Sequence, residues 1–254
     1  MSLWPRWMVV LAVVGILMPQ AAAAGDFAAA AGSETPCGAP ASELENPFPL
    51  THVQAAIRER RRVTAVALGS SSTAGNAASS PTAAWPARLE THLAQGLKGV
   101  AVTVANAGLP RQSAAQMVER IAKDVLSRAP DLVVWEVGTA EAMRGTDPEA
   151  FEQVLLQGLD QLAKAGSDVL LMNMQFSPPT SKVINFYPYL EIMESAAAMR
   201  SLWVFDRYAI MQHWVEGGRF SFEDKPLAQQ RQLADQVYDC LGQILAEVIG
   251  RAAK

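Results

Sequence analysis

Five short runs of consecutive apolar residues, separated by longer stretches with helical spacing, set the pattern of this chain. Each run is brief and apolar on successive positions, which is typical of central strands in a parallel sheet that helices cover on both faces. We therefore predict strands at residues 63–68, 100–105, 132–137, 169–174 and 202–205.

Amphipathic segments lie between these runs and predict helices at residues 86–97, 113–126, 148–163 and 227–249. Strands and helices that alternate in this way favour an α/β fold, a three-layer sandwich with a parallel sheet between two layers of helices and right-handed crossovers. In such sheets the chemistry lies in the loops beyond the carboxyl ends of the strands. Those loops are where a site is expected.

The first residues predict export. A short basic start is followed by apolar residues 7–18 and then by small residues, which is the pattern of a cleaved secretory signal over residues 1–24. The apolar run is short for a membrane span, which needs about 20 residues, and an uncleaved anchor is the alternative. Residues 25–48 are rich in Ala, Gly, Ser and Pro and predict a flexible lead, followed by one domain over 49–254. We expect a periplasmic or secreted protein with no membrane span after cleavage.

Charge and composition narrow the classes of partner. The 254 residues carry a net charge of −4 and half of them are apolar, which suits one globular domain with a substantial core. Lysine and arginine are scattered, so the sequence predicts no binding of nucleic acid. The one basic run, residues 58–62, is interpreted as a solvated segment, with a patch for phosphate or an anionic polymer as the alternative. No oligomeric state is indicated.

The two cysteines, Cys37 and Cys240, leave two interpretations open. In an oxidising compartment they can form a disulfide between the lead and the last helix. Two unrelated thiols are the alternative, at equal weight. Neither cysteine has a second cysteine or a histidine at metal-binding spacing, so we predict no metal site and no cofactor.

The loops after the first two predicted strands carry motifs that resemble the SGNH, or GDSL, hydrolase superfamily. Gly69-Ser-Ser71-Ser-Thr73 is similar to the family's Gly-Asp-Ser-x-Thr block, and Asn106-Ala-Gly108 to its Asn-x-Gly block. The resemblance extends from about residue 63 to the last helix. It implies a sheet of order 2-1-3-4-5, ester hydrolysis as the activity, Ser71 as the nucleophile and the Gly108 amide as an oxyanion donor.

Two later blocks depart from the family pattern. Ala140 stands where the family has an asparagine that donates to the oxyanion, and losing one such donor costs roughly 10² to 10³ in turnover. Glu141 beside it brings a negative charge that would oppose an oxyanion. The family's final Asp-x-x-His block falls on Gln229 and Gln232, and a second register based on Lys225 also lacks the pair.

A serine nucleophile needs a neighbouring base, and the sequence offers three histidines. We expect His52 and His92 to lie far from Ser71. His213 follows the fifth strand and is the only candidate for a relocated base, with Asp206 to orient it. The interpretation that we favour is that Met211, Trp214 and His213 pack a short helix against the sheet edge.

Two functions of different class follow. In the first, the protein is a degenerate hydrolase with weak or absent esterase activity, and it acts as a binding or assembly component of the cell envelope through the cleft of the former active site. In the second, Ser71 is the nucleophile of an active serine esterase, for example a carbohydrate O-deacetylase, with His213 as its base. An acylated saccharide or another small ester is the expected ligand in both, and Gln229 and Gln232 are expected to hydrogen-bond its hydroxyls.

Overall fold

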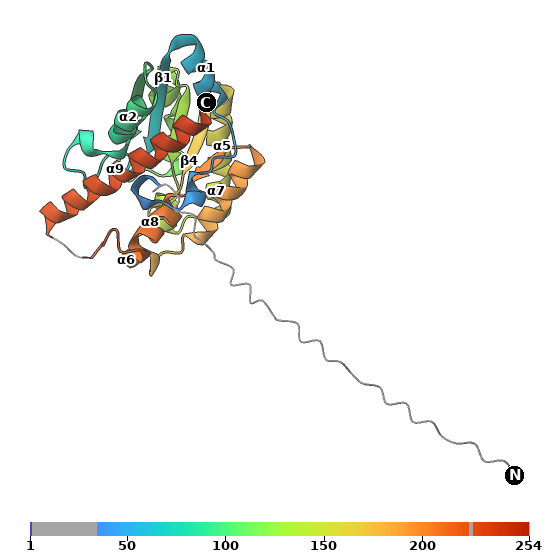
Figure 1. The fold of residues 1–254 in the computed structure, drawn as a ribbon, viewed down its shortest axis with the longest axis vertical. Coiled ribbons are helices and arrows are strands. Elements are labelled where there is room, and N and C mark those ends of the chain that lie inside the picture. The colour runs from blue at the N-terminus through green and yellow to red at the C-terminus, as the bar shows by residue number, and fades with distance from the viewer. Residues whose placement is uncertain (2–34, 224–225, 254) are drawn as a thin grey trace. The chain divides into compact units, whose positions relative to one another are not determined.

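One parallel sheet of five strands forms the centre of the protein (Figure 1). The computed structural model describes Met1 and residues 35–223 and 226–253, so the predicted signal and the first part of the predicted lead lie outside the described residues. The sheet order β2-β1-β3-β4-β5 confirms the predicted order and fold class. The strands are β1 (Arg62–Gly69), β2 (Ala101–Gly108), β3 (Leu132–Glu136), β4 (Asp168–Met172) and β5 (Trp203–Phe205).

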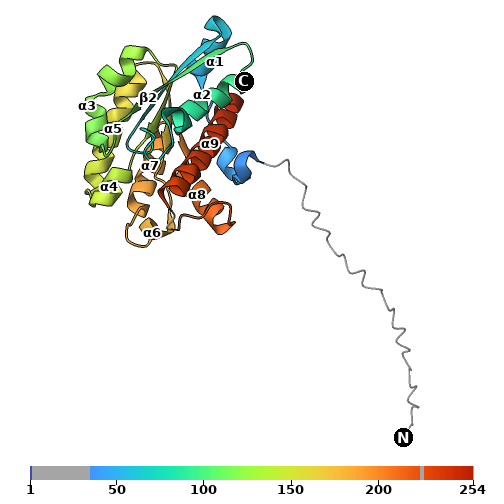
Figure 2. The same cartoon turned by 90° about the vertical axis from the view of Figure 1, so that its left-hand side faces the viewer.

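Helices cover both faces of this sheet (Figures 1 and 2). One layer consists of α1 (Thr51–Arg60), α2 (Trp85–Gly96), α8 (Arg207–Glu216) and α9 (Leu227–Ala252). The opposite layer consists of α3 (Ala114–Glu119), α5 (Pro148–Lys164) and α7 (Tyr187–Met199). Short helices α4 (Thr139–Arg144) and α6 (Pro178–Ser181) follow β3 and β4. Within the described residues, no helix is long and apolar enough to cross a membrane.

The apolar runs of the sequence reflect two cores, one on each face of the sheet. Successive side chains of a strand point to opposite faces. In β1, Ala65 and Ala67 therefore pack among α1, α2, α8 and α9, whereas Val66 and Leu68 pack among α3, α5 and α7. Both faces are buried, so the strand shows no polar alternation.

The helix predicted at 113–126 is interrupted. Ser113 begins α3 with a capping box to Gln116, and α3 ends at Glu119. A π-helical turn, η4 (Ile121–Val125), and a 3₁₀ turn, η5 (Leu126–Arg128), follow. Arg120 lies at the break and is buried, because its guanidinium reaches back to the Gly69 carbonyl at the end of β1. The turn after β1 thus interrupts the helix.

The predicted lead is too long at its carboxyl end. Its described part forms two short helical turns, η1 (Pro36–Gly38) and η2 (Ala41–Leu44), in which Ala39 and Leu44 are buried against the core. Cys37 forms a disulfide with Cys240 of α9, and the Trp214 indole of α8 donates to the Cys37 carbonyl at 2.9 Å. Of the two interpretations of the cysteines, the structure shows the disulfide. It attaches this segment to both α8 and α9.

Candidate functional site

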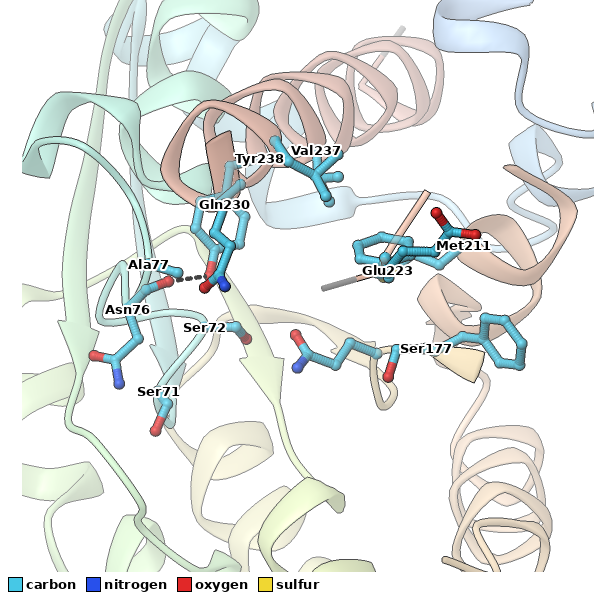
Figure 3. Close-up of a pocket in the computed structure, with 15 residues that line it drawn as sticks. Ser71, Ser72, Asn76, Ala77, Ser177, Met211, Glu223, Gln230, Val237 and Tyr238 are labelled. Carbon is cyan, nitrogen blue, oxygen red and sulfur yellow. Dashed lines mark hydrogen bonds between the residues drawn. The ribbon is translucent and has the colours of Figure 1, made fainter. Parts of the chain in front are cut away.

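A cleft of about 450 Å³ opens beyond the carboxyl ends of the strands, between the turn after β1 and helices α8 and α9 (Figure 3). One side, here called the serine wall, consists of Ser71, Ser72, Asn76 and Ala77. The opposite side, the helical wall, consists of Met211 of α8 and Gln230, Leu233, Ala234, Val237 and Tyr238 of α9. The loop after β4, with Gln175, Phe176 and Ser177, and the segment Phe222–Glu223 complete the lining.

A buried carboxylate holds the turn that carries the serines. Glu136, the last residue of β3, is 2% exposed and accepts hydrogen bonds from the Ser70 amide at 3.0 Å and the Thr73 hydroxyl at 2.8 Å. Arg207, the first residue of α8, pairs with the same carboxylate at 3.2 Å. Gly69 permits this approach, because a Cβ there would clash with Thr73 and Glu136. The serine turn is therefore attached to the next strand of the sheet and to α8.

The pKa of Glu136 favours its ionised form. Burial by itself raises the pKa of Glu136. The Arg207 charge and the hydrogen bonds from Ser70, Thr73 and Ser72 lower it by more than burial raises it, so the pKa lies below its ordinary value. Arg207 also donates to the Ser72 hydroxyl at 2.8 Å. The two charges neutralise each other directly behind the serine wall.

Sequence reasoning missed both members of this pair. A signal was present, because Glu136 ends an otherwise apolar strand and Arg207 follows the apolar fifth strand almost directly. A charged residue inside a buried run must have a partner, since an unpaired buried charge is costly. The identity of the partner depends on the fold.

The hydroxyl at the predicted nucleophile position is held by a backbone amide. Ser71 lines the cleft and is partly exposed, and its Oγ accepts a hydrogen bond from the Arg111 amide at 2.9 Å. Arg111 lies in the loop after β2 with a left-handed backbone, φ 62°. An N–H donor draws electron density from the oxygen that it binds. The contact therefore lowers the nucleophilicity of Ser71, whereas a base would raise it.

The predicted oxyanion donor is engaged within the turn. The Gly108 amide donates to Asn106 Oδ1 at 2.8 Å, and Asn106 Nδ2 donates to the Thr73 carbonyl at 2.7 Å. A Cβ on Gly108 would overlap the backbone of Thr73 and Ala74, so glycine is needed for the end of β2 to pack against the serine turn. The Asn-x-Gly motif here joins two loops.

The side chain at the position of the family's asparagine cannot donate a hydrogen bond. Ala140 lies half-buried in the first turn of α4. Glu141 is 3% exposed and accepts a hydrogen bond from the Ala114 amide, the first residue of α3, at 2.6 Å. Burial raises the pKa of its carboxyl group. Glu141 therefore caps a neighbouring helix.

All three histidines lie in the described part of the chain, and none of them lines the cleft. His52, on α1, lies beside Asp168 at the amino edge of the sheet, the edge opposite the cleft. His92, on α2, contacts Asp239 of α9 at 2.8 Å. Met211 and Trp214 pack α8 against the core, as expected, whereas His213 is exposed in the last turn of that helix.

The structure does not bring Asp206 and His213 together. Asp206 caps the amino end of α8, where its Oδ1 accepts hydrogen bonds from the Ala209 amide at 2.9 Å and from Asn173 Nδ2 at 2.7 Å. His213 lies almost two turns further along the same helix, roughly 10 Å along its axis. The side chain of α8 that does line the cleft is Met211.

The glutamines aligned with the family's last block also lie outside the cleft. Gln229 and Gln232 are exposed on α9, and Gln232 lines a separate hollow with Asp235. Gln230 lines the cleft instead, as does Tyr238, whose hydroxyl donates to the Asn76 carbonyl at 2.7 Å (Figure 3). Burial, the main cause, raises the pKa of Tyr238 to about 12. This phenol remains protonated and joins the two walls.

A model of a protein family matches residues 36–254, which is nearly all of the described domain. The chain belongs to the Non-GDSL lipase-like family. The family's description fits the first motif, because Ser70 and Ser72 stand where a Gly-Asp-Ser-Leu block has aspartate and leucine.

Solved structures confirm the SGNH hydrolase fold for this Non-GDSL lipase-like protein. A lipase/acylhydrolase from Enterococcus faecalis has a TM-score of 0.58 at 20% identity, over 74% of this chain and 96% of the other. A variant of an acetyl-xylooligosaccharide esterase from Geobacillus Stearmophilus has a TM-score of 0.57 at 15% identity, over 75% and 94%. A two-domain esterase active on acetylated mannans, crystallised with mannopentaose, has a TM-score of 0.63 at 19% identity, over 80% and 55%. No curated sequence gives a match.

Proposed function

We propose that this protein is an exported member of the SGNH hydrolase fold whose catalytic machinery is incomplete, and that its cleft binds an acylated saccharide as a binding or assembly component of the cell envelope. One observation carries the proposal. The Ser71 hydroxyl accepts a hydrogen bond from a backbone amide, and none of the chain's three histidines lines the cleft beside it.

The expected loss of activity is large. In a serine triad, removal of the histidine alone costs about 10⁶ in turnover. Here the Gly108 amide is also engaged by Asn106, and Ala140 has no group to donate. Each missing oxyanion donor costs roughly a further 10² to 10³. We therefore expect weak or absent ester hydrolysis.

The two walls of the cleft suit a ligand with one polar and one apolar side. The serine wall offers hydroxyl and amide groups, while Leu233, Val237 and Met211 make the helical wall apolar. Behind the serine wall, Arg207 and Glu136 neutralise each other. An acetylated sugar has this combination of hydroxyls and methyl groups, and two of the structural neighbours are esterases of acetylated saccharides.

The disulfide supports export. Disulfides persist in the periplasm and outside the cell, and are rare in the reducing cytosol. The bond between Cys37 and Cys240 thus agrees with the secretory signal proposed for residues 1–24. We place the protein in the periplasm or among secreted proteins.

An active serine esterase is the second candidate, because Ser71 lies just beyond the carboxyl end of β1 and lines the cleft. Esterase activity would require His213 to leave its exposed position on α8 and bind the Ser71 hydroxyl. The proton of that hydroxyl would then pass to the imidazole as the oxygen attacks the ester carbonyl.

Turnover of p-nitrophenyl acetate separates the two candidates. We expect the wild type, Ser71→Ala and His213→Ala to hydrolyse the ester at the same rate. Ser79→Ala is the matched control, because Ser79 is exposed outside the cleft. Robust turnover that both Ser71→Ala and His213→Ala abolish, and that Ser79→Ala leaves intact, would establish the esterase.

Calorimetry with acetylated xylo-oligosaccharides tests binding separately from catalysis. We expect the wild type to bind them, and Val237→Asp to bind at least about tenfold more weakly, because a carboxylate would be placed against the acetyl groups in the apolar wall. Glu216→Gln on the exposed face of α8 is the control. Equal binding by Val237→Asp and the wild type would contradict the assignment of this cleft.

A further inference from the structure

Five exposed cationic residues lie on neighbouring elements at the amino edge of the sheet, the edge opposite the cleft. They come from the end of α1, the start of β1, the turn between α2 and β2, and η5. We call this surface the cationic edge, and its members are Arg58, Arg61, Arg62, Lys98 and Arg128. Figure 1 shows α1 at the end of the molecule away from α6 and α8, which flank the cleft.

Hydrogen bonds and strand pairing hold these elements side by side. Arg61 Nε donates to the Gly99 carbonyl at 3.1 Å, which places Arg61 against the turn that carries Lys98. Arg62 of β1 lies opposite Ala101 of β2 in the register of the sheet. The Asp131 amide, which follows η5 closely in the chain, donates to the Thr64 carbonyl at 2.8 Å. The basic run of the sequence is therefore extended by cations that lie far from it in the chain.

Few acidic groups oppose this surface. Arg60 is not counted in the cationic edge, because it pairs with the buried Asp131. Arg58 is counted, because its pair with Glu59 is exposed to solvent on both sides and is weak. Arg62 and Lys98 form no ion pair within the described residues. The chain as a whole carries a net charge of −4. A polyanion is thus repelled by the net charge of the molecule and attracted by the cations of this edge.

We propose that the cationic edge binds a carboxylated polysaccharide, independently of the cleft. Guanidinium groups match carboxylates with paired hydrogen bonds, and four of the five members are arginines. A membrane surface fits less well, because interfacial binding usually adds apolar side chains to the cations. Among the described residues, the exposed large apolar side chains of the domain lie on other elements, at Leu109, Met143, Val183, Tyr187, Met199 and Leu227.

Titration of the full chain with polygalacturonate tests this proposal, with neutral dextran and phosphatidylglycerol vesicles as comparison ligands. Arg62→Gln/Lys98→Gln removes one arginine and one lysine from the cationic edge. Lys182→Gln/Arg231→Gln is the matched control, because these exposed residues belong to neither the cationic edge nor the cleft. Circular dichroism verifies that both variants fold, and Lys98→Glu provides a second variant with a single change.

At low salt we expect the wild type, the control and Ser71→Ala to bind polygalacturonate equally, and Arg62→Gln/Lys98→Gln to bind about tenfold more weakly. Binding by the wild type should vanish at about 0.5 M NaCl, where charges are screened within a few ångströms. Equal binding by both double variants, equal binding of dextran, or binding of the vesicles without binding of polygalacturonate would overturn the proposal. The unchanged binding of Ser71→Ala separates it from the function proposed for the cleft.

Discussion

Different interactions hold the two walls of the cleft in place. In the serine wall, polar contacts fix the side chains: Arg111 binds Ser71 and Arg207 binds Ser72. The helical wall is packed by apolar side chains such as Val237, and the disulfide at Cys240 ties its long helix to the segment before α1. Tyr238 connects the two walls by its hydrogen bond to Asn76.

Under the proposed function, this difference explains how the shape of an SGNH site can persist without its catalytic groups. The serine wall is held by a buried ion pair and its hydrogen bonds, which need no catalysis to be stabilising. The helical wall needs only apolar packing and the disulfide. Neither wall depends on a base for its stability, so the fold does not by itself maintain the reaction.

Breaking the ion pair behind the serine wall should have the largest effect on the free energy of unfolding. Glu136→Gln leaves Arg207 buried without a charged partner, which costs about 3–5 kcal/mol in the free energy of unfolding. Urea denaturation measures the loss. Glu247→Gln is the control, because its pair with Arg251 is exposed and worth at most about 1 kcal/mol. Glu136→Gln/Arg207→Met should lose less than the sum of the two single variants.

The same pair predicts the direction of a pH effect. The pKa of Glu136 is lowered in the folded state, so its contribution to stability is complete above the ordinary value of 4.5 and is lost as the pH falls through the lowered folded pKa. Wild-type stability should therefore fall in acid more steeply than that of Glu136→Gln. Parallel curves of unfolding free energy against pH would contradict the ionised pair.

Removing the disulfide that holds the helical wall should have the next largest effect on the free energy of unfolding. Cys37→Ser/Cys240→Ser opens the disulfide between η1 and α9, and removal of a native disulfide from a small secreted domain typically costs about 2–5 kcal/mol. Thermal unfolding with and without reductant measures it. The wild type with reductant should approach the double variant, and a loss below about 1 kcal/mol would show that packing alone holds α9.

Removing the hydrogen bond that connects the two walls should lower the free energy of unfolding by less than removing the disulfide does. Tyr238→Phe removes the hydrogen bond to the Asn76 carbonyl, worth about 1 kcal/mol in unfolding free energy. Tyr187→Phe is the control, because Tyr187 is 67% exposed. Equal stabilities of the two variants would show that Tyr238 acts by packing alone.

The smallest effect is expected at the other buried glutamate of this edge. The pKa of Glu141 is raised by burial, so the folded state favours its neutral form, and wild-type stability should rise as the pH falls from above the folded pKa towards 4.5. Glu141→Gln carries a neutral side chain at every pH. At pH 7 it should lie within about 1 kcal/mol of the wild type in unfolding free energy. A loss as large as that of Glu136→Gln would show that the charged form of Glu141 is needed.

The sequence predicts the sheet well because its strands are buried on both faces, so that each appears as an unbroken apolar run. It predicts α1 poorly, since only Val53 and Ala56 of that helix are buried. The strand order came from the family resemblance, and the structure confirms it. Local pattern is thus enough for the strands, whereas it misses both α1, which buries little, and α7, which buries Tyr189, Met193, Ala196 and Ala197.

The candidate site was predictable only in part. Ser71 and Gly108 follow strands and are located by the motifs, and the structure places each at the carboxyl edge of the sheet. Their hydrogen-bond partners depend on loop geometry, including the left-handed Arg111, and on contacts between distant segments, such as Arg207 with Glu136. No periodicity in a single chain encodes those contacts.

The most direct test of the central claim, that Ser71 is not activated, is labelling of the intact protein with a fluorophosphonate followed by mass spectrometry. We predict no adduct on Ser71 in the wild type, because an alkoxide-like oxygen needs a base to take its proton. A stoichiometric adduct on Ser71, abolished in His213→Ala, would contradict the account and establish a working serine hydrolase.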